Sequence, residues 1–185
     1  MKELSLHILD LAENSVKAEA TKISISIFED TEKDLLIINI EDNGRGMDEE
    51  LLKKVEDPFV TSRTTRKVGL GIPLMKAAAL RCEGDFKISS EIGKGTKITC
   101  IFKHSHIDRA PIGDIGQTII SLINANENIE IVYKHSYNGN CFVFDTKEVK
   151  NILGDVPINE AHIMLWIKDY INENIMSLYR NSQEE

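Results

Sequence analysis

The start of the chain changes from a helical rhythm of apolar residues to a strand rhythm. Apolar side chains recur every three or four positions from Leu4 to Ala20, which predicts an amphipathic helix. Isoleucines then occupy every second position from Ile23 to Ile27, which predicts a strand. A charged turn over 30–34 leads into the apolar, β-branched run 35–40. We therefore expect a helix followed by two paired strands.

Further elements follow up to residue 104. Asp48 is suited to cap a short helix that ends near Val55, and a segment rich in Leu, Ala and Met predicts a longer helix over 69–82. Two more strands are expected over 85–90 and 96–102, on either side of a Gly-Lys-Gly turn. Strands in adjacent hairpins with helices on one side predict an α+β fold, a two-layer α/β sandwich.

Residues 105–185 form a second predicted region. Asn138-Gly139, between two β-rich runs, is a strong signal for a type I′ hairpin. The pattern divides the chain into a domain over 1–104 and a small α+β C-terminal region over 105–185. The elements expected in this second region are helices over 115–125, 146–153 and 159–180, and strands over 129–135 and 141–144.

Composition narrows the class of protein. The net charge is -8; residues 1–104 carry 16 basic and 18 acidic side chains, and residues 105–185 carry 6 and 12. This acidity argues against a nucleic-acid partner, which calls for a basic patch. Three widely spaced cysteines predict reduced thiols. We see neither a signal peptide nor an apolar run of about 20 residues, so we expect a cytoplasmic protein with no membrane contact.

The predicted first helix carries a possible catalytic and metal-binding face. Asp10, Asn14 and Lys17 are spaced by four and three residues, so they share one side of the helix. An amide oxygen suits Mg²⁺, a lysine suits phosphate, and a carboxylate can orient or deprotonate water. Read alone, the same pattern also fits a solvated helix face.

A glycine-containing turn follows the second predicted strand. Asp42 at the strand end can accept a hydrogen bond from an exocyclic amine such as that of adenine. Gly44 and Gly46, followed by Met47, let the main chain pass close to a planar base. The alternative is an ordinary Asp-Asn-Gly turn.

A second glycine motif opens the helix expected over 69–82. Gly69, Leu70 and Gly71 would present main-chain N–H groups to an anion at a helix N-terminus. The preceding polar loop could cover phosphates, or it is simply a solvated basic loop. Its cations are Arg63, Arg66 and Lys67.

Together these motifs, in this order, resemble the GHKL superfamily, which includes gyrase B, mismatch-repair ATPases, the heat-shock chaperone and sensor histidine kinases. The matching segments are Glu13-Asn14-Ser15-Val16-Lys17-Ala18 (N box), Asp42 to Gly46 (G1 box), Asp57-Pro58-Phe59 (F box), Gly69-Leu70-Gly71 (G2 box) and Gly93-Lys94-Gly95-Thr96 (the last glycine box).

The resemblance covers residues 4–103 and implies a Bergerat ATP-binding fold that takes ATP with Mg²⁺. It implies that Asn14 is the magnesium ligand and that Asp42 reads adenine, helped by Gly46 and Thr96. Main-chain groups of residues 69–71 would meet the phosphates, and Lys17 matches a phosphate-contacting lysine of the histidine-kinase branch.

Two departures leave the use of ATP open. Hydrolysing members place a glutamate where this chain has Asp10, whose side chain is shorter by one methylene. Val68 stands where kinases often have threonine. We expect a regulatory ATP-binding protein that phosphorylates a protein partner, as anti-sigma-type kinases do. The alternatives are a slow ATP hydrolase with Asp10 as general base and a non-catalytic, nucleotide-gated scaffold.

The last predicted helix is the candidate surface for a partner. It carries Trp166, Tyr170, Met176 and Tyr179, residue types that are enriched at protein interfaces. Such a surface would serve an unidentified protein or a second copy in a homodimer. The alternative interpretation is that these residues are part of the core.

Overall fold

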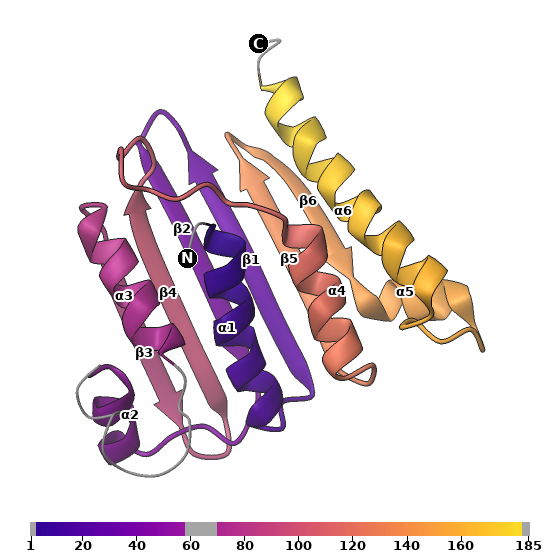
Figure 1. The fold of residues 1–185 in the computed structure, drawn as a ribbon, viewed down its shortest axis with the longest axis horizontal. Coiled ribbons are helices and arrows are strands. Elements are labelled where there is room, and N and C mark those ends of the chain that lie inside the picture. The colour runs from indigo at the N-terminus through magenta and orange to yellow at the C-terminus, as the bar shows by residue number, and fades with distance from the viewer. Residues whose placement is uncertain (1–2, 58–69, 183–185) are drawn as a thin grey trace.

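A computed structural model describes residues 3–57 and 70–182, and it contains one six-stranded sheet in the order β3-β4-β2-β1-β5-β6. Helices cover one face of that sheet (Figure 1). The predicted α+β two-layer sandwich is therefore confirmed. The elements are α1 (Leu4–Lys17), β1 (Lys22–Asp30), β2 (Leu35–Asp42), α2 (Glu49–Val55), α3 (Gly71–Arg81), β3 (Asp85–Glu91), β4 (Gly95–Lys103), α4 (Ile115–Ala125), β5 (Glu130–Tyr137), β6 (Asn140–Asp145), α5 (Thr146–Leu153) and α6 (Ala161–Asn181).

The hydrophobic core lies between the sheet and this helical layer. Alternate residues of each strand point toward the helices, so Ile23, Ile25 and Ile27 of β1 are buried while their neighbours are more exposed. On the helical side, α1 contributes Ile8 and Leu11 to the same core. The period-two pattern of β1 thus fixes which face of the sheet the helices cover.

Local side-chain chemistry explains where several helices begin and end. The Asp48 carboxylate accepts a hydrogen bond from the N–H of Leu51 at 2.8 Å, so the predicted cap of α2 is confirmed. The first helix is shorter than predicted, since it ends at Lys17 and not at Ala20. Glu19 adopts a positive φ of 60°, which stops the helix without a glycine.

The C-terminal region extends the same sheet. β5 pairs in parallel with β1, so that Ile25 lies opposite Tyr133, and α4 and α6 add to the helical layer (Figure 1). The predicted type I′ hairpin is confirmed by φ values of 46° at Asn138 and 88° at Gly139. The division at residue 104 stays a prediction; strands from both predicted regions lie side by side.

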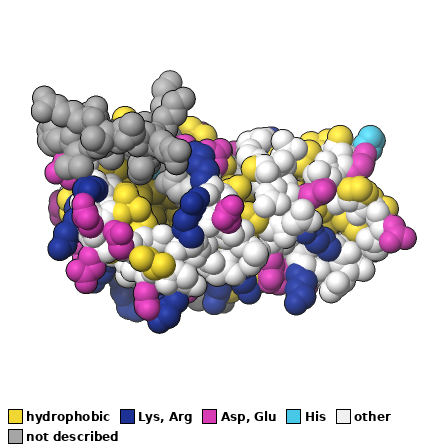
Figure 2. Space-filling model, turned by 90° about the horizontal axis from the view of Figure 1, so that it is seen from below, with side chains coloured by type: hydrophobic (Ala, Val, Ile, Leu, Met, Phe, Trp, Pro, Cys, Tyr) yellow, Lys and Arg dark blue, Asp and Glu magenta, His cyan; other side chains and the backbone are white. Residues whose placement is uncertain are grey.

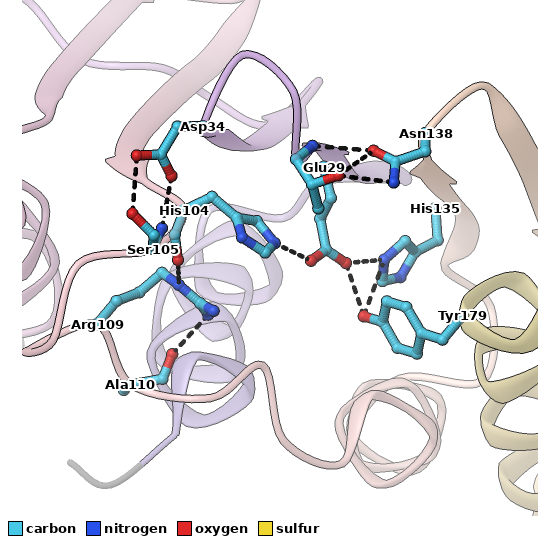
Figure 3. Close-up of polar contacts among 10 residues, drawn as sticks. Glu29, Asp34, His104, Ser105, Arg109, Ala110, His135, Asn138 and Tyr179 are labelled. Carbon is cyan, nitrogen blue, oxygen red and sulfur yellow. Dashed lines mark hydrogen bonds and ion pairs between the residues drawn. The ribbon is translucent and has the colours of Figure 1, made fainter. Parts of the chain in front are cut away.

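A buried carboxylate ties the two regions together. Glu29, at the end of β1, accepts hydrogen bonds from His135 of β5 at 2.7 Å, Tyr179 of α6 at 2.6 Å and His104 at 2.8 Å (Figure 3). Burial alone would raise the pKa of Glu29, but these three hydrogen bonds outweigh it and hold the pKa below its ordinary value. We call these four residues the Glu29 cluster.

No helix in the described ranges, 3–57 and 70–182, is both long and apolar enough to cross a membrane. The longest, α6, interrupts its apolar residues with charged ones such as Lys168, Asp169 and Glu173. Its buried residues instead recur on one side, at Ile167, Ile171 and Ile175, as expected for a helix packed on a core.

Candidate functional site

A pocket of about 240 Å³ opens between the C-terminal half of α1 and the adjacent ends of β2 and β4. Apolar side chains form its walls, and hydrophobic groups gather on this face of the molecule, with lysines and arginines beside them (Figure 2). Such a mostly apolar cavity with a few placed polar groups is typical of a small-molecule site. The apolar walls include Leu11, Ile40, Val55, Ile72 and Ile98.

The structure brings most of the predicted site residues to this pocket. Gly44 lies directly beside it, and Leu70 immediately precedes α3. Asp10 and Gly71 do not line the pocket but lie against each other nearby. The predicted residues that line the pocket are Asn14, Lys17, Asp42, Gly46, Met47 and Thr96; Arg63, Arg66, Lys67 and Gly69 lie outside the described residues.

The Asp42 carboxylate is held by two donors. The hydroxyl of Ser15 donates to Oδ2 at 2.5 Å, and the N–H of Gly44 donates to Oδ1 at 2.9 Å. Because each oxygen has a fixed partner, the orientation of the carboxylate toward the pocket is set before any ligand arrives. Ser15 was not predicted as a site residue; its place next to Asn14 on the apolar stripe of α1 was the available signal.

Thr96 is positioned across the sheet from Asp42. The two residues are paired partners on β2 and β4, and the Thr96 hydroxyl lies 2.9 Å from that of Ser90. Ser90 also accepts a hydrogen bond from the N–H of Met47 at 2.8 Å. This contact fastens the turn after β2 to the β3–β4 hairpin, so both sides of the pocket floor are held together.

Two glycines are required by the close approach of main-chain segments at the pocket floor. Gly46 has a φ of 68°, and a Cβ on it would lie 2.0 Å from the carbonyl oxygen of Glu91. Gly95 has a φ of 114°, and a Cβ there would lie 1.9 Å from the carbonyl oxygen of Asp42. Any larger residue would push these segments apart.

The helix end next to the pocket is suited to an anion. Leu70 at the N-cap of α3 offers no side-chain acceptor, and the first turn carries no acidic residue. The N–H groups and the positive dipole end of this turn therefore favour a negative ligand. A Cβ on Gly71 would lie 3.3 Å from the Cβ of Asp10, so Asp10 packs against the start of α3. At the pocket rim, the Arg45 guanidinium donates to the carbonyl of Lys17.

Comparison with known proteins identifies the family of this chain. Residues 2–106 match the family described as histidine kinase-, DNA gyrase B-, and HSP90-like ATPase. The match covers more than half of the chain, so the chain belongs to this family. Membership in this family supports ATP binding by this chain.

Two kinases are similar to this chain over the same region. Sporulation kinase D of Bacillus subtilis (strain 168) is 36% identical over 94 residues, which cover 50% of this chain and 18% of the kinase. The signal transduction histidine-protein kinase AtoS of Escherichia coli (strain K12) is 35% identical over 101 residues, covering 55% and 16%. The similarity therefore spans less than a fifth of each kinase.

One solved structure supports the fold alone. The crystal structure of the N-terminal domain of a DNA repair protein superposes with a TM-score of 0.51 at 14% identity, covering 85% of this chain and 59% of that one. The alignment thus reaches beyond residue 106, in keeping with the single sheet that both regions share.

Proposed function

We propose that this protein is a regulatory ATP-binding protein that takes ATP with Mg²⁺ in the pocket and phosphorylates a protein partner. The observation that carries the proposal is the fixed Asp42 carboxylate at the base of an apolar pocket, with Asn14 and Lys17 on the adjoining helix. The similarity to two kinases supports phosphoryl transfer as the use of the nucleotide.

In this proposal the base and the phosphates of ATP have separate partners. Adenine enters between the apolar walls and donates its exocyclic amine to Asp42, with Thr96 beside it. The phosphates meet Lys17 and the N-terminus of α3 at Gly71. In the undescribed segment, Gly69 would add another main-chain donor, and Arg63, Arg66 and Lys67 would cover the phosphates.

The donor set also fits magnesium. Mg²⁺ is usually held by one or two protein oxygens together with phosphate oxygens and waters. Asn14 offers such an oxygen, because its side-chain amide lines the pocket and has no hydrogen-bond partner among the described residues. When bound, the ion would neutralise phosphate charge, and the chain's own contribution is to hold Asn14 and Lys17 on one helix face.

We expect Asp42→Ala to weaken binding of Mg·ATP by about 10- to 100-fold, the usual effect of losing a hydrogen bond to a charged group. Isothermal titration calorimetry measures this directly. Glu41→Ala is the matched control, because Glu41 is the preceding acid on β2 and its exposed side chain points to the opposite face of the sheet. Absence of Mg·ATP binding by the unmodified protein, or full binding by Asp42→Ala, would rule out the proposed site.

Ser15→Ala should lower ATP affinity several-fold, because the Asp42 carboxylate loses the donor that orients its Oδ2. A competition assay with a purine triphosphate that lacks the exocyclic amine separates the causes. If Ser15 acts by orienting Asp42 toward the amine, the exchange should weaken binding of ATP but hardly change binding of the analogue. Equal losses for both nucleotides would contradict a positioning role.

Partner phosphorylation needs its own test. Phosphoryl transfer depends mainly on positioning and electrostatics, so we expect label from γ-³²P-ATP to reach a protein substrate only when Asp42 is intact. Candidate partners are incubated with the protein and separated on a gel. Retained binding without label transfer and without turnover would instead favour a nucleotide-gated scaffold.

A second candidate function is slow ATP hydrolysis with Asp10 as general base. The observation in its favour is the packing of Gly71 against Asp10, which puts an acidic residue beside the start of α3, where the phosphates are proposed to bind. Aspartate reaches one methylene less far than the glutamate of hydrolysing family members, so a water must come closer to α1. We therefore expect any hydrolysis to be slow.

A further inference from the structure

The sheet ends in an edge strand whose own sequence carries little of the usual protection against pairing. β6 is last in the strand order, and among the described residues it pairs with β5 alone. Edge strands of monomeric proteins commonly carry lysine, proline or an inward charge that discourages further pairing. β6 has the sequence Asn-Cys-Phe-Val-Phe-Asp, with its only charge at the last residue.

The hairpin register shows which main-chain groups of β6 are free. A two-residue type I′ turn makes Tyr137 and Asn140 the first hydrogen-bonded pair, and such pairs then alternate along the ladder. Phe142 therefore bonds back to β5, whereas the N–H and C=O groups of Cys141 and Val143 point away from the sheet. Neither residue has another main-chain hydrogen bond among the described residues.

Exposed apolar side chains flank this edge on both faces. On the helical face, the Phe142 ring contacts Tyr170 of α6 at 5.7 Å between centroids, and Tyr170 stacks on Trp166 at 4.9 Å. Trp166 is 52% exposed and Leu165 is 60% exposed. The end of the molecule that holds α5 and the start of α6 accordingly shows apolar groups (Figure 2). On the other face, Val143 is 53% exposed.

We propose that β6 pairs antiparallel with β6 of a second copy, about a two-fold axis that passes through Val143. The hydrogen-bond register sets this axis. The outward main-chain groups of Val143 in one copy face those of Val143 in the other, and the outward groups of Cys141 face those of Asp145 in the other copy. Asp145 then faces a neutral residue, so no like charges meet in the new ladder. The two α6 helices lie on the same face and bring Trp166 and Leu165 of each copy together.

The buried area agrees with a dimer. A buried aromatic side chain covers about 150–250 Å², so the exposed half of Trp166 supplies about 100 Å² per copy. Leu165, Tyr170, Val143 and the strand edge bring the total for both copies to on the order of 1,000 Å², where specific interfaces begin. The ATP pocket, formed by α1, β2 and β4, lies outside this surface and stays open in both copies.

Sedimentation velocity of the full chain over a range of concentrations tests the proposal. We expect the unmodified protein to form dimers and Trp166→Glu to weaken them by about 30-fold or more, as for loss of a buried interface tryptophan. Val143→Pro should also abolish dimers, yet leave the fold intact by circular dichroism, because the lost N–H points away from β5. Ile107→Glu is the control, since Ile107 is an equally apolar, 95% exposed residue far from β6.

The outcomes separate this proposal from the ATP site. A chain that sediments as a monomer at every concentration overturns it. Dimers that survive both Val143→Pro and Trp166→Glu, or that Ile107→Glu disrupts equally, also overturn it. Each variant should keep the Mg·ATP affinity of the unmodified protein, because no exchanged residue lines the pocket.

Discussion

Glu29→Ala is expected to lower the free energy of unfolding by about 3–5 kcal/mol, because three donors lose their acceptor and each buried group left unsatisfied costs about 1–3 kcal/mol. The side chain of Glu29 is 4% exposed and that of His135 is fully buried, so water cannot replace the lost carboxylate. His135 and the Tyr179 hydroxyl would each lose a hydrogen-bond acceptor. Urea denaturation at pH 7, followed by circular dichroism, measures the change.

The same carboxylate makes stability depend on pH in a defined direction. Its pKa is lower in the folded protein than in the unfolded chain, so its contribution is complete above the ordinary glutamate pKa of about 4.3. It is lost as the pH falls through the lower, folded value. The difference in stability between the unmodified protein and Glu29→Gln should therefore be constant near neutrality and shrink in acid.

Glu32→Ala is the control for this prediction. Glu32 is an exposed acid in the turn just after β1, and surface changes of this kind usually alter stability by less than about 0.5 kcal/mol. A loss of stability in Glu29→Ala no greater than that in Glu32→Ala would show that the Glu29 cluster does not anchor α6 and β5. A difference between Glu29→Gln and the unmodified protein that grows in acid would contradict the stated direction of the pKa shift.

Asp10→Asn should reduce the release of ADP from ATP by about 100-fold or more, the usual contribution of a general base, if Asp10 activates the attacking water. Asparagine has nearly the same size but cannot take a proton, so ATP binding should be unchanged. A coupled assay measures turnover, and calorimetry measures affinity on the same preparation. The two measurements together distinguish a lost base from a damaged pocket.

Glu13→Gln provides the matched exchange of acid for amide on the same helix. Glu13 is half-buried and lies outside the pocket lining, so turnover should stay at its original level. Turnover that survives in Asp10→Asn would exclude Asp10 as the general base. Absence of turnover in both the unmodified protein and Asp10→Asn would remove the hydrolase alternative, and phosphoryl transfer to a protein would then be the remaining catalytic use of the nucleotide.

The helices, strands and turns were predicted well, because capping residues, turn residues and apolar periodicity act over only a few positions. The Asn138-Gly139 turn, the Asp48 cap and the alternating isoleucines of β1 each act within a few residues, and all three appear in the structure. The predicted end of α1 was too late in the sequence, because Glu19 adopts a positive φ that usually favours glycine. The neighbouring residues give no sequence signal for this conformation.

Contacts between residues far apart in the sequence could not be predicted, because no local pattern specifies them. The alternation of β1 puts Glu29 on the same face as Ile27, which marks it as a buried acid, but Tyr179 lies 150 positions away in the sequence. The parallel pairing of β5 with β1 has no local signature either. At the site, the motifs predicted Asp42 and Thr96, whereas the contact from Ser15 depends on how α1 packs against the end of β2.

The pairing of β1 with β5 also affects how the chain is made. β1 ends at Asp30, and β5, its second partner strand, ends at Tyr137. One edge of the isoleucine-rich β1 therefore stays unpaired while the intervening residues are synthesised. At about 5–20 residues per second, that wait lasts about 5–20 s. During this interval the nascent chain exposes an unpaired, aggregation-prone strand edge. Translation speed and chaperones should therefore strongly influence the yield of soluble protein.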